Sequence, residues 1–300
     1  MKKPRIPHCL LIALALASIP CVSAQNGLPA SQPKRLTIVR EDVKVGLGAD
    51  HAKNEAGWPA AYEKAKSPNY YIALTSMTGP STALYLVPFD SFAAEAESMK
   101  REDKDPVLSA ELSRLSLRDA EFISNATVVQ TVARTDLSVG KFPDVAKARF
   151  FEISTFTVRQ SQTQNFDAVM KAYGAARKRV APDTSYRVYA VDAGMPAPTY
   201  FIIQSVQDYA QFDQVNADHL KTLSSPTPEE KAIFDKWGDI VSRGETQRYR
   251  VDPVQSYVSK EVRASDPDFW SPKCAADRRQ RTTPCEPRLI RGAFLWPGGK

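Results

Sequence analysis

Short runs of β-branched and aromatic residues alternate with longer runs of helical periodicity along most of the chain. The first kind predicts eight strands, at residues 35–46, 69–79, 82–89, 126–137, 149–159, 185–194, 198–206 and 245–252. The second kind predicts helices at residues 49–66, 90–102, 105–123, 163–180, 207–220 and 227–243. Within the first helix, Pro59 lacks the amide that would bond to the Glu55 carbonyl, so we expect a kink there.

The order of these elements occurs twice, as β-α-β-β-α-α-β in each half. Matched positions lie 114 to 117 residues apart: Arg35 matches Arg149, Phe92 matches Tyr209, and Arg134 matches Arg250. A nearly constant offset between matched elements indicates an internal duplication. We therefore predict a first repeat over residues 36–146 and a second repeat over residues 147–262.

Each repeat has the element order of a ferredoxin-like unit, in which helices cover one face of a mainly antiparallel sheet. The uncovered face of each sheet is too apolar for water, and two such sheets in one chain can cover each other. The sequence therefore predicts an α+β fold in which two tandem repeats form an intrachain α/β barrel with their sheets face to face. A single chain can close this barrel, so a monomer is sufficient.

The phrases "GADHAKNEAGW" and "YYIALTSMTGPSTALYLVPFDSFAA", followed by a second copy of the same element order, carry a family resemblance. Residues 36–262 resemble the dimeric α/β-barrel superfamily, which includes NIPSNAP-type, antibiotic-biosynthesis-monooxygenase-type and haem-degrading domains. The chain is most similar to tandem, secreted bacterial members of that group. The resemblance implies the fold and leaves the activity open.

The two ends of the chain differ in character from the repeats. Residues 1–24 have a basic start, a short apolar core and small residues before Ala24, as in a signal peptide cleaved after Ala24. We therefore expect a periplasmic or secreted protein without a membrane span, whose residues 25–35 form a linker. Residues 263–300 should form an irregular basic tail, in which Cys274 and Cys285 pair as a disulfide in an oxidising compartment.

The net charge of +6 comes from the two ends of the chain. The leader carries three Lys/Arg and no acid, and the segment from Arg263 carries eight Lys/Arg and four Asp/Glu, which leaves residues 25–262 at −1. A nucleic-acid-binding domain would need a basic body, so we expect no nucleic-acid partner.

The candidate catalytic residues lie in the helix that opens at residue 49. His51, Glu55 and Trp58 are spaced at i, i+4 and i+7, which places them on one helix face. The first two could hold a metal ion, form a general base with its orienting carboxylate, or simply face solvent. We predict that any catalytic or ligand site lies in the first repeat and includes His51 with Glu55 as partner, without a metal or cofactor. His219, near a helix end, is expected to be structural.

Aromatic residues on the hairpin strands suggest a ligand pocket inside the barrel. Because successive residues of a strand point to opposite faces, some of these tyrosines and Arg187 should point into the space between the sheets. The predicted lining residues are Trp58, Tyr71, Tyr85, Arg187, Tyr189 and Tyr200. Tyrosine is also a favourable strand residue, so the same pattern fits an ordinary sheet.

Several catalytic motifs are missing from the sequence: a Gly-rich phosphate loop, Gly-x-Ser-x-Gly, His-Glu-x-x-His and Cys-x-x-Cys. The leading interpretation is an exported barrel that binds a small molecule or serves a structural role. The first alternative is a cofactor-independent monooxygenase or isomerase that acts on an aromatic or polyketide-like compound in the first repeat. The second alternative is a protein-interaction module.

Overall fold

The computed structural model describes residues 27–271 of the chain. The predicted leader and the two cysteines of the tail, Cys274 and Cys285, lie outside the described residues. The strands are β1 Arg35–Val43, β2 Tyr71–Ser76, β3 Thr82–Phe89, β4 Ile123–Ala133, β5 Phe150–Val158, β6 Arg187–Ala193, β7 Thr199–Val206 and β8 Val241–Tyr257. The longer helices are α1 Gly48–Glu55, α2 Gly57–Ala65, α3 Phe92–Lys104, α4 Pro106–Asp119, α5 Thr163–Val180 and α6 Gln211–Ser224. The short helices are α7 Pro228–Phe234, α8 Trp237–Ile240, α9 Lys260–Ser265 and α10 Pro267–Trp270.

The eight strands form one closed antiparallel barrel in the order β1-β3-β2-β8-β5-β7-β6-β4. Each half contributes a four-stranded sheet, β4-β1-β3-β2 from the first repeat and β8-β5-β7-β6 from the second. The sheets join edge to edge where β2 pairs with β8 and where β4 pairs with β6. The predicted tandem ferredoxin-like barrel is confirmed, and the edge pairing leaves no strand of the barrel exposed at an edge.

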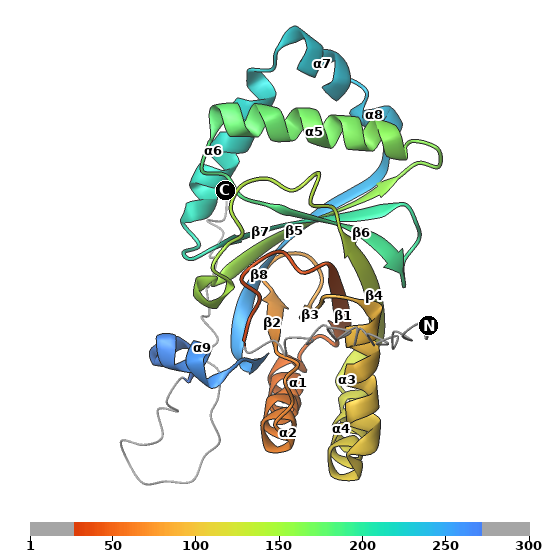
Figure 1. The fold of residues 1–300 in the computed structure, drawn as a ribbon, viewed down its shortest axis with the longest axis vertical. Coiled ribbons are helices and arrows are strands. Elements are labelled where there is room, and N and C mark those ends of the chain that lie inside the picture. Colours follow the sequence, from red (N-terminus) through yellow and green to blue (C-terminus); the bar gives the residue numbers. More distant parts are fainter. Residues whose placement is uncertain (1–26, 272–300) are drawn as a thin grey trace, which may run out of the picture.

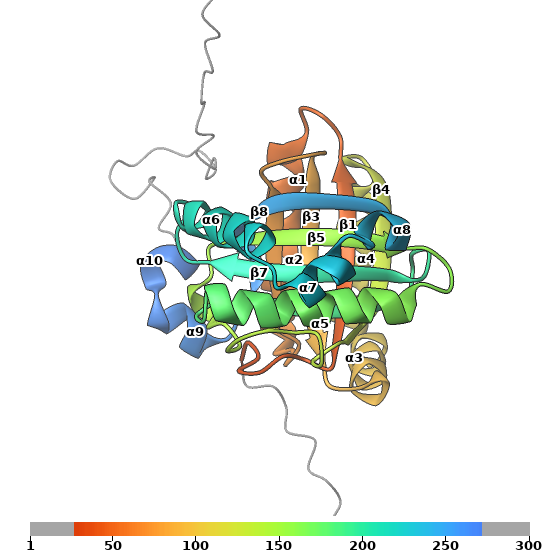
Figure 2. The ribbon, with the colours of Figure 1, turned by 90° about the horizontal axis from the view of Figure 1, so that it is seen from above.

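Helices α1 to α8 lie on the outside of the barrel, in two groups at opposite ends of the molecule (Figure 1). Helices α1 to α4 extend from the first sheet and α5 to α8 cover the second, so each sheet lies between its own helices and the other sheet (Figures 1 and 2). Each repeat therefore has two separate spaces for side chains: the barrel interior, which the halves share, and a helix-covered face of its own.

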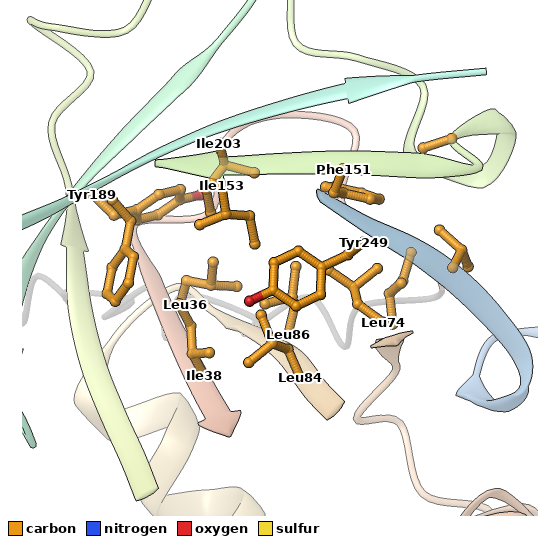
Figure 3. Packing of buried hydrophobic residues seen from close by; sticks show 14 of the residues in the cluster. Leu36, Ile38, Leu74, Leu84, Leu86, Phe151, Ile153, Tyr189, Ile203 and Tyr249 are labelled. Carbon is orange, nitrogen blue, oxygen red and sulfur yellow. The ribbon is translucent and has the colours of Figure 1, made fainter. Parts of the chain in front are cut away.

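The barrel interior is filled with apolar side chains (Figure 3). Its buried cluster comprises Leu36, Ile38, Ile72, Leu74, Leu84, Leu86, Phe151, Ile153, Phe201, Ile203, Val251 and neighbours. Because strand residues alternate between faces, Tyr71, Tyr85 and Tyr200 point instead toward the helices, where they join other clusters. The predicted tyrosine-lined cavity between the sheets is therefore wrong. Tyr189 alone among the predicted tyrosines belongs to the interior cluster.

Local sequence signals explain where several helices begin and end. The predicted 49–66 helix is two helices, which meet at Ala56, three residues before Pro59. Asp105 caps α4 by accepting bonds from the amides of Val107 and Leu108, ahead of Pro106 at the first position. No helix among residues 27–271 is long and apolar enough to cross a membrane.

The start of the predicted irregular tail is ordered. Two short helices, α9 and α10, follow β8, and the indole of Trp270 is buried against the barrel cluster with Phe269 beside it. Trp270 Nε1 donates to the carbonyl of Ala146, 3.1 Å away. The expectation of irregular structure is thus wrong for residues 263–270, because the aromatic pair finds an apolar surface to cover.

Candidate functional sites

Four ionisable side chains converge between the first sheet and its helices. Glu41 comes from β1, and Asp119 is the last residue of α4. His51 and Glu55 lie one turn apart on α1. One ring nitrogen or carboxylate oxygen from each of the four lies within 4.8 Å of the others. These four residues are called the first-half cluster below.

The direct partner of His51 is Glu41 and not the predicted Glu55. His51 Nε2 lies 2.9 Å from Oε2 of Glu41 and 3.7 Å from Oδ1 of Asp119. His51, Glu55 and Asp119 expose only 2 %, 3 % and 4 % of their surfaces, so the cluster is a buried site. The solvated helix face considered from the sequence is excluded.

Neighbouring donors hold the carboxylates of the cluster in place. The indole Nε1 of Trp58 donates to Oε1 of Glu55 at 3.0 Å. Asn54 donates to the Leu115 carbonyl at 3.1 Å, and its amide reaches Oδ1 of Asp119 at 3.5 Å. The predicted association of Trp58 with Glu55 is therefore present, as a hydrogen bond.

The surroundings of the cluster shift three pKa values upward. Burial raises the pKa of Glu55 to about 8, and the charge of Glu41 adds to this effect. Burial also raises the pKa of Asp119, again with help from Glu41. Burial lowers the pKa of His51, but the hydrogen bond to Glu41 and the nearby carboxylates outweigh it, and the net direction is upward. At neutral pH the site therefore retains protons.

A pocket of about 250 Å³ opens beside this cluster, between the first sheet and its helices. Glu41 and Glu55 both line it, together with three of the predicted pocket residues, Trp58, Tyr71 and Tyr85. The sequence thus identified residues of one real pocket, on the opposite face of the sheet from the one expected.

A larger cavity lies in the second half, in the corresponding space between sheet and helices. It measures about 620 Å³, within the range of about 300–1,000 Å³ that is usual for small-molecule sites. Its apolar walls come from strands β5 and β7 and from helices α5 to α8, and include Phe156, Val169, Met170, Ile202, Leu223 and Trp237. The sequence analysis placed any ligand site in the first repeat and did not predict this cavity in the second.

Two buried polar groups on the wall of this cavity lack partners. Arg177 is 2 % exposed, and its Nη2 donates to Thr184 at 3.0 Å. Among the described residues, its Nε and Nη1 have no hydrogen-bond acceptor. The hydroxyl of Tyr186, 3 % exposed, is also without a partner there. Buried unsatisfied donors are costly, which makes them candidates for contacts to a ligand.

His219, for which the sequence predicts a structural role, also lines the large cavity. Its Nδ1 lies 2.7 Å from the hydroxyl of Tyr173 on α5. Burial lowers the pKa of His219, and the positive charge of Arg177 acts in the same direction. His219 is therefore neutral at pH 7, and the cavity holds a permanent positive charge only on its arginines, Arg177 and Arg248. Arg248 is already paired with Glu152 at 2.9 Å.

The remaining predicted pocket residues lie elsewhere. Arg187 and Tyr189 line a small apolar space of about 70 Å³ at the barrel. Arg187 is held by backbone carbonyls of Val139, Gly140 and Lys141. The ring of Tyr200 stacks on Phe166, with centroids 4.2 Å apart, outside the cavity lining. The six predicted lining residues therefore do not form one pocket.

Comparison with known proteins adds likenesses of fold. No family model matches the chain, and no curated protein matches it. A monooxygenase-like protein from Lactobacillus acidophilus is 8 % identical, with a TM-score of 0.47 over 73 % of this chain and 94 % of that one. An anthrone oxidase-like protein is 13 % identical, with a TM-score of 0.45 over 75 % and 94 %. A chlorite dismutase variant from Candidatus Nitrospira defluvii is 8 % identical, with a TM-score of 0.47 over 78 % and 96 %. Because these values are low, no activity is transferred from them to this chain.

Proposed function

We propose that the protein binds a small, largely apolar molecule with an anionic group in the cavity of the second half. The observation that carries this proposal is the guanidinium of Arg177, buried at the cavity wall with Nε and Nη1 unpaired among the described residues. An arginine presents parallel donors that match a carboxylate or sulfonate. A bound anion would supply the missing acceptors.

The rest of the cavity defines the body of this ligand. Aromatic and aliphatic side chains make up most of its wall, with the ring of Trp237 packed edge-on against Phe156 at 5.0 Å between centroids. Such walls favour a planar or branched apolar body. The hydroxyl of Tyr186 can donate to a second oxygen of the ligand, since it has no partner among the described residues.

Two fluorescent probes of nearly the same shape test the proposal. 1-Anilinonaphthalene-8-sulfonate carries an anion, and N-phenyl-1-naphthylamine is its uncharged counterpart. We expect the wild-type protein to bind the sulfonate more tightly. Arg177→Met should weaken the sulfonate about tenfold to a hundredfold, because a charge-assisted bond contributes roughly 1.5–3 kcal/mol. The uncharged probe should be unaffected.

Arg243→Met provides the matched control, because Arg243 is an exposed arginine on β8 outside the cavity. It should bind both probes like the wild type, and Arg177→Lys should retain part of the preference for the anion. Equal affinity for the two probes in the wild-type protein, or an unchanged sulfonate affinity in Arg177→Met, would contradict the proposed anion site.

A second candidate function is catalysis in the first half, as a cofactor-independent monooxygenase or isomerase for an aromatic compound. It is favoured by the position of Glu55, a buried acid with a pKa of about 8 on the wall of a tyrosine-rich pocket. Such a group can exchange protons near neutral pH. Oxygen consumption with polyhydroxylated aromatic compounds should then be lost in Glu55→Gln and kept in Asp103→Asn, at an exposed position on α3 outside the pocket. No consumption by the wild type would exclude the oxygenase.

We also propose that the protein acts outside the cytoplasm, on the strength of the leader sequence. When expressed with its own leader in a bacterial host, the mature chain should be found in the periplasm or medium and begin at Gln25. Thiol labelling without reduction should then find Cys274 and Cys285 blocked. A cytoplasmic chain that begins at Met1, or two free thiols, would count against export or the disulfide respectively.

A further inference from the structure

We propose that the first-half cluster is a site for one divalent transition-metal ion, held by Glu41, His51, Glu55 and Asp119. Three carboxylates and one imidazole are ligands suited to Mn²⁺, Fe²⁺ or Zn²⁺. Bonds of about 2.0–2.2 Å to a central ion place neighbouring ligand atoms roughly 3–4 Å apart. The cluster's atoms already lie within 4.8 Å of one another, with His51 2.9 Å from Glu41 and 3.7 Å from Asp119.

The charge of the cluster supports a cation. Among the described residues, neither a lysine nor an arginine forms an ion pair with any of its three carboxylates, and His51 is their sole basic partner. With all three carboxylates ionised, as ligands of a metal ion are, the cluster carries an excess of negative charge even beside a protonated His51. Burying such an excess is costly, and a divalent ion would neutralise it.

Hydrogen-bond donors surround the carboxylates of the cluster, as they surround the ligands of known metal sites. Trp58 donates to Glu55, and Asn54 connects the Leu115 carbonyl with Asp119, so neither carboxylate is free to rotate. Outer donors of this kind fix the orientation of ligating groups. They are neutral groups, and therefore do not compete with a cation for the carboxylate charge.

The position of the cluster leaves one side of the ion accessible. Glu41 and Glu55 line the 250 Å³ pocket, whereas His51 and Asp119 are not part of its lining. An ion between the four residues would face this pocket, next to Tyr85 and Trp58. A metal with an open side toward a cavity is typical of a reactive site, while a purely structural site is closed by protein ligands.

Binding of Mn²⁺ alone to untagged, chelator-treated full-length protein tests this inference. Loss of the free-ion electron paramagnetic resonance signal should report one site per chain, and Mn²⁺ is a hard ion for which the cysteines of the tail compete poorly. Glu55→Gln and Asp119→Asn should each weaken binding at least about tenfold to a hundredfold. Thermal unfolding of the wild type should shift upward with Mn²⁺, and that shift should be reduced in both variants.

Glu102→Gln is the matched control, because Glu102 lines the same pocket without belonging to the cluster. It should bind Mn²⁺ more nearly like the wild type than either cluster variant does, because it removes a charge from the pocket but no ligand atom from the cluster. His51→Gln, a fourth variant, keeps a polar side chain at that position if one of the others fails to fold. No binding of Mn²⁺ or Zn²⁺ by the wild type, or equal binding by the cluster variants and Glu102→Gln, would overturn the metal site. Because the anion probes report on the other half, failure here leaves the proposed ligand cavity standing.

Discussion

The two halves of the barrel use the same space, between sheet and helices, in opposite ways. The members of the first-half cluster have counterparts one repeat away, at a constant offset of 115 residues. His51 and Phe166 are each the fourth residue of their helix, and Asp119 and Phe234 each end theirs. The four pairs are Glu41 and Phe156, His51 and Phe166, Glu55 and Met170, and Asp119 and Phe234.

This comparison shows how a duplicated unit can divide its chemistry. Every ionisable member of the cluster is replaced by a large apolar residue in the second half, and three of those replacements line the large cavity. The second half places its own buried charge further along, at Arg177 near the end of α5. One half thus concentrates negative charge in a small pocket, and the other presents positive charge in a large apolar one.

The largest effect on stability should come from a substitution of Phe166, the apolar counterpart of His51. Phe166 is fully buried and stacks on Tyr200, so Phe166→Ala should lower the free energy of unfolding by about 3–5 kcal/mol. Urea unfolding followed by circular dichroism measures this loss. Leu117→Ala, at a position that is 78 % exposed, should cost less than about 0.5 kcal/mol. A loss below about 1 kcal/mol in Phe166→Ala would show that this position is not a core counterpart of the cluster.

The next largest effect is a pH dependence of stability that comes from the first half. The pKa of Glu55 is raised in the folded protein, and those of His51 and Asp119 move in the same direction. At these three groups the folded state therefore binds more protons than the unfolded chain, and the stability they contribute is present below about pH 4.5 and lost as pH rises toward 8, whereas the lowered pKa of His219 acts in the opposite direction. In metal-free protein, the unfolding midpoint should fall by about 5 °C between pH 5 and pH 8.

Glu55→Gln tests the origin of that slope, because a glutamine cannot titrate. Its midpoint should depend less on pH than that of the wild type, whereas Asp103→Asn, at an exposed position on α3, should retain the slope. Added Mn²⁺ should flatten the wild-type dependence as well, if the cluster holds the ion. A midpoint that rises between pH 5 and pH 8 in metal-free protein would contradict the sign of these shifts.

The sequence was sufficient for the element order and the duplication, because both depend on local periodicity and on the offset between copies. It did not reveal which face of each strand would be covered. Alternation shows that Tyr71 and Tyr85 lie on opposite faces from Ile72 and Leu86, but both faces are apolar, so parity cannot say which one faces the barrel. This is why the tyrosines were placed on the wrong side.

The candidate sites were only partly predictable for a related reason. His51 and Glu55 share a helix, so their spacing brings them together, whereas Glu41 and Asp119 come from other elements and meet them only after folding. Arg177 lies within the basic run Arg177–Arg179 at the end of a helix, which is typical of a solvated terminus. A signal was present nonetheless, since Phe166, Met170, Tyr173 and Arg177 follow one helical stripe.

The smallest expected effect is on the stability of the ligand-free protein, in which the charge of Arg177 is buried without a ligand. Without ligand, the guanidinium of Arg177 is buried with two nitrogens unpaired among the described residues, so replacing it with an apolar side chain should relieve a desolvation penalty. Arg177→Met should therefore raise the free energy of unfolding of the ligand-free protein by about 1 kcal/mol, while Arg243→Met should leave it unchanged. Urea unfolding of extensively dialysed protein measures the difference. A stabilised variant with weakened sulfonate binding would identify Arg177 as a residue kept for binding. A less stable variant would show that the arginine holds α5 in place. The contrast between the two halves would then be one of packing alone.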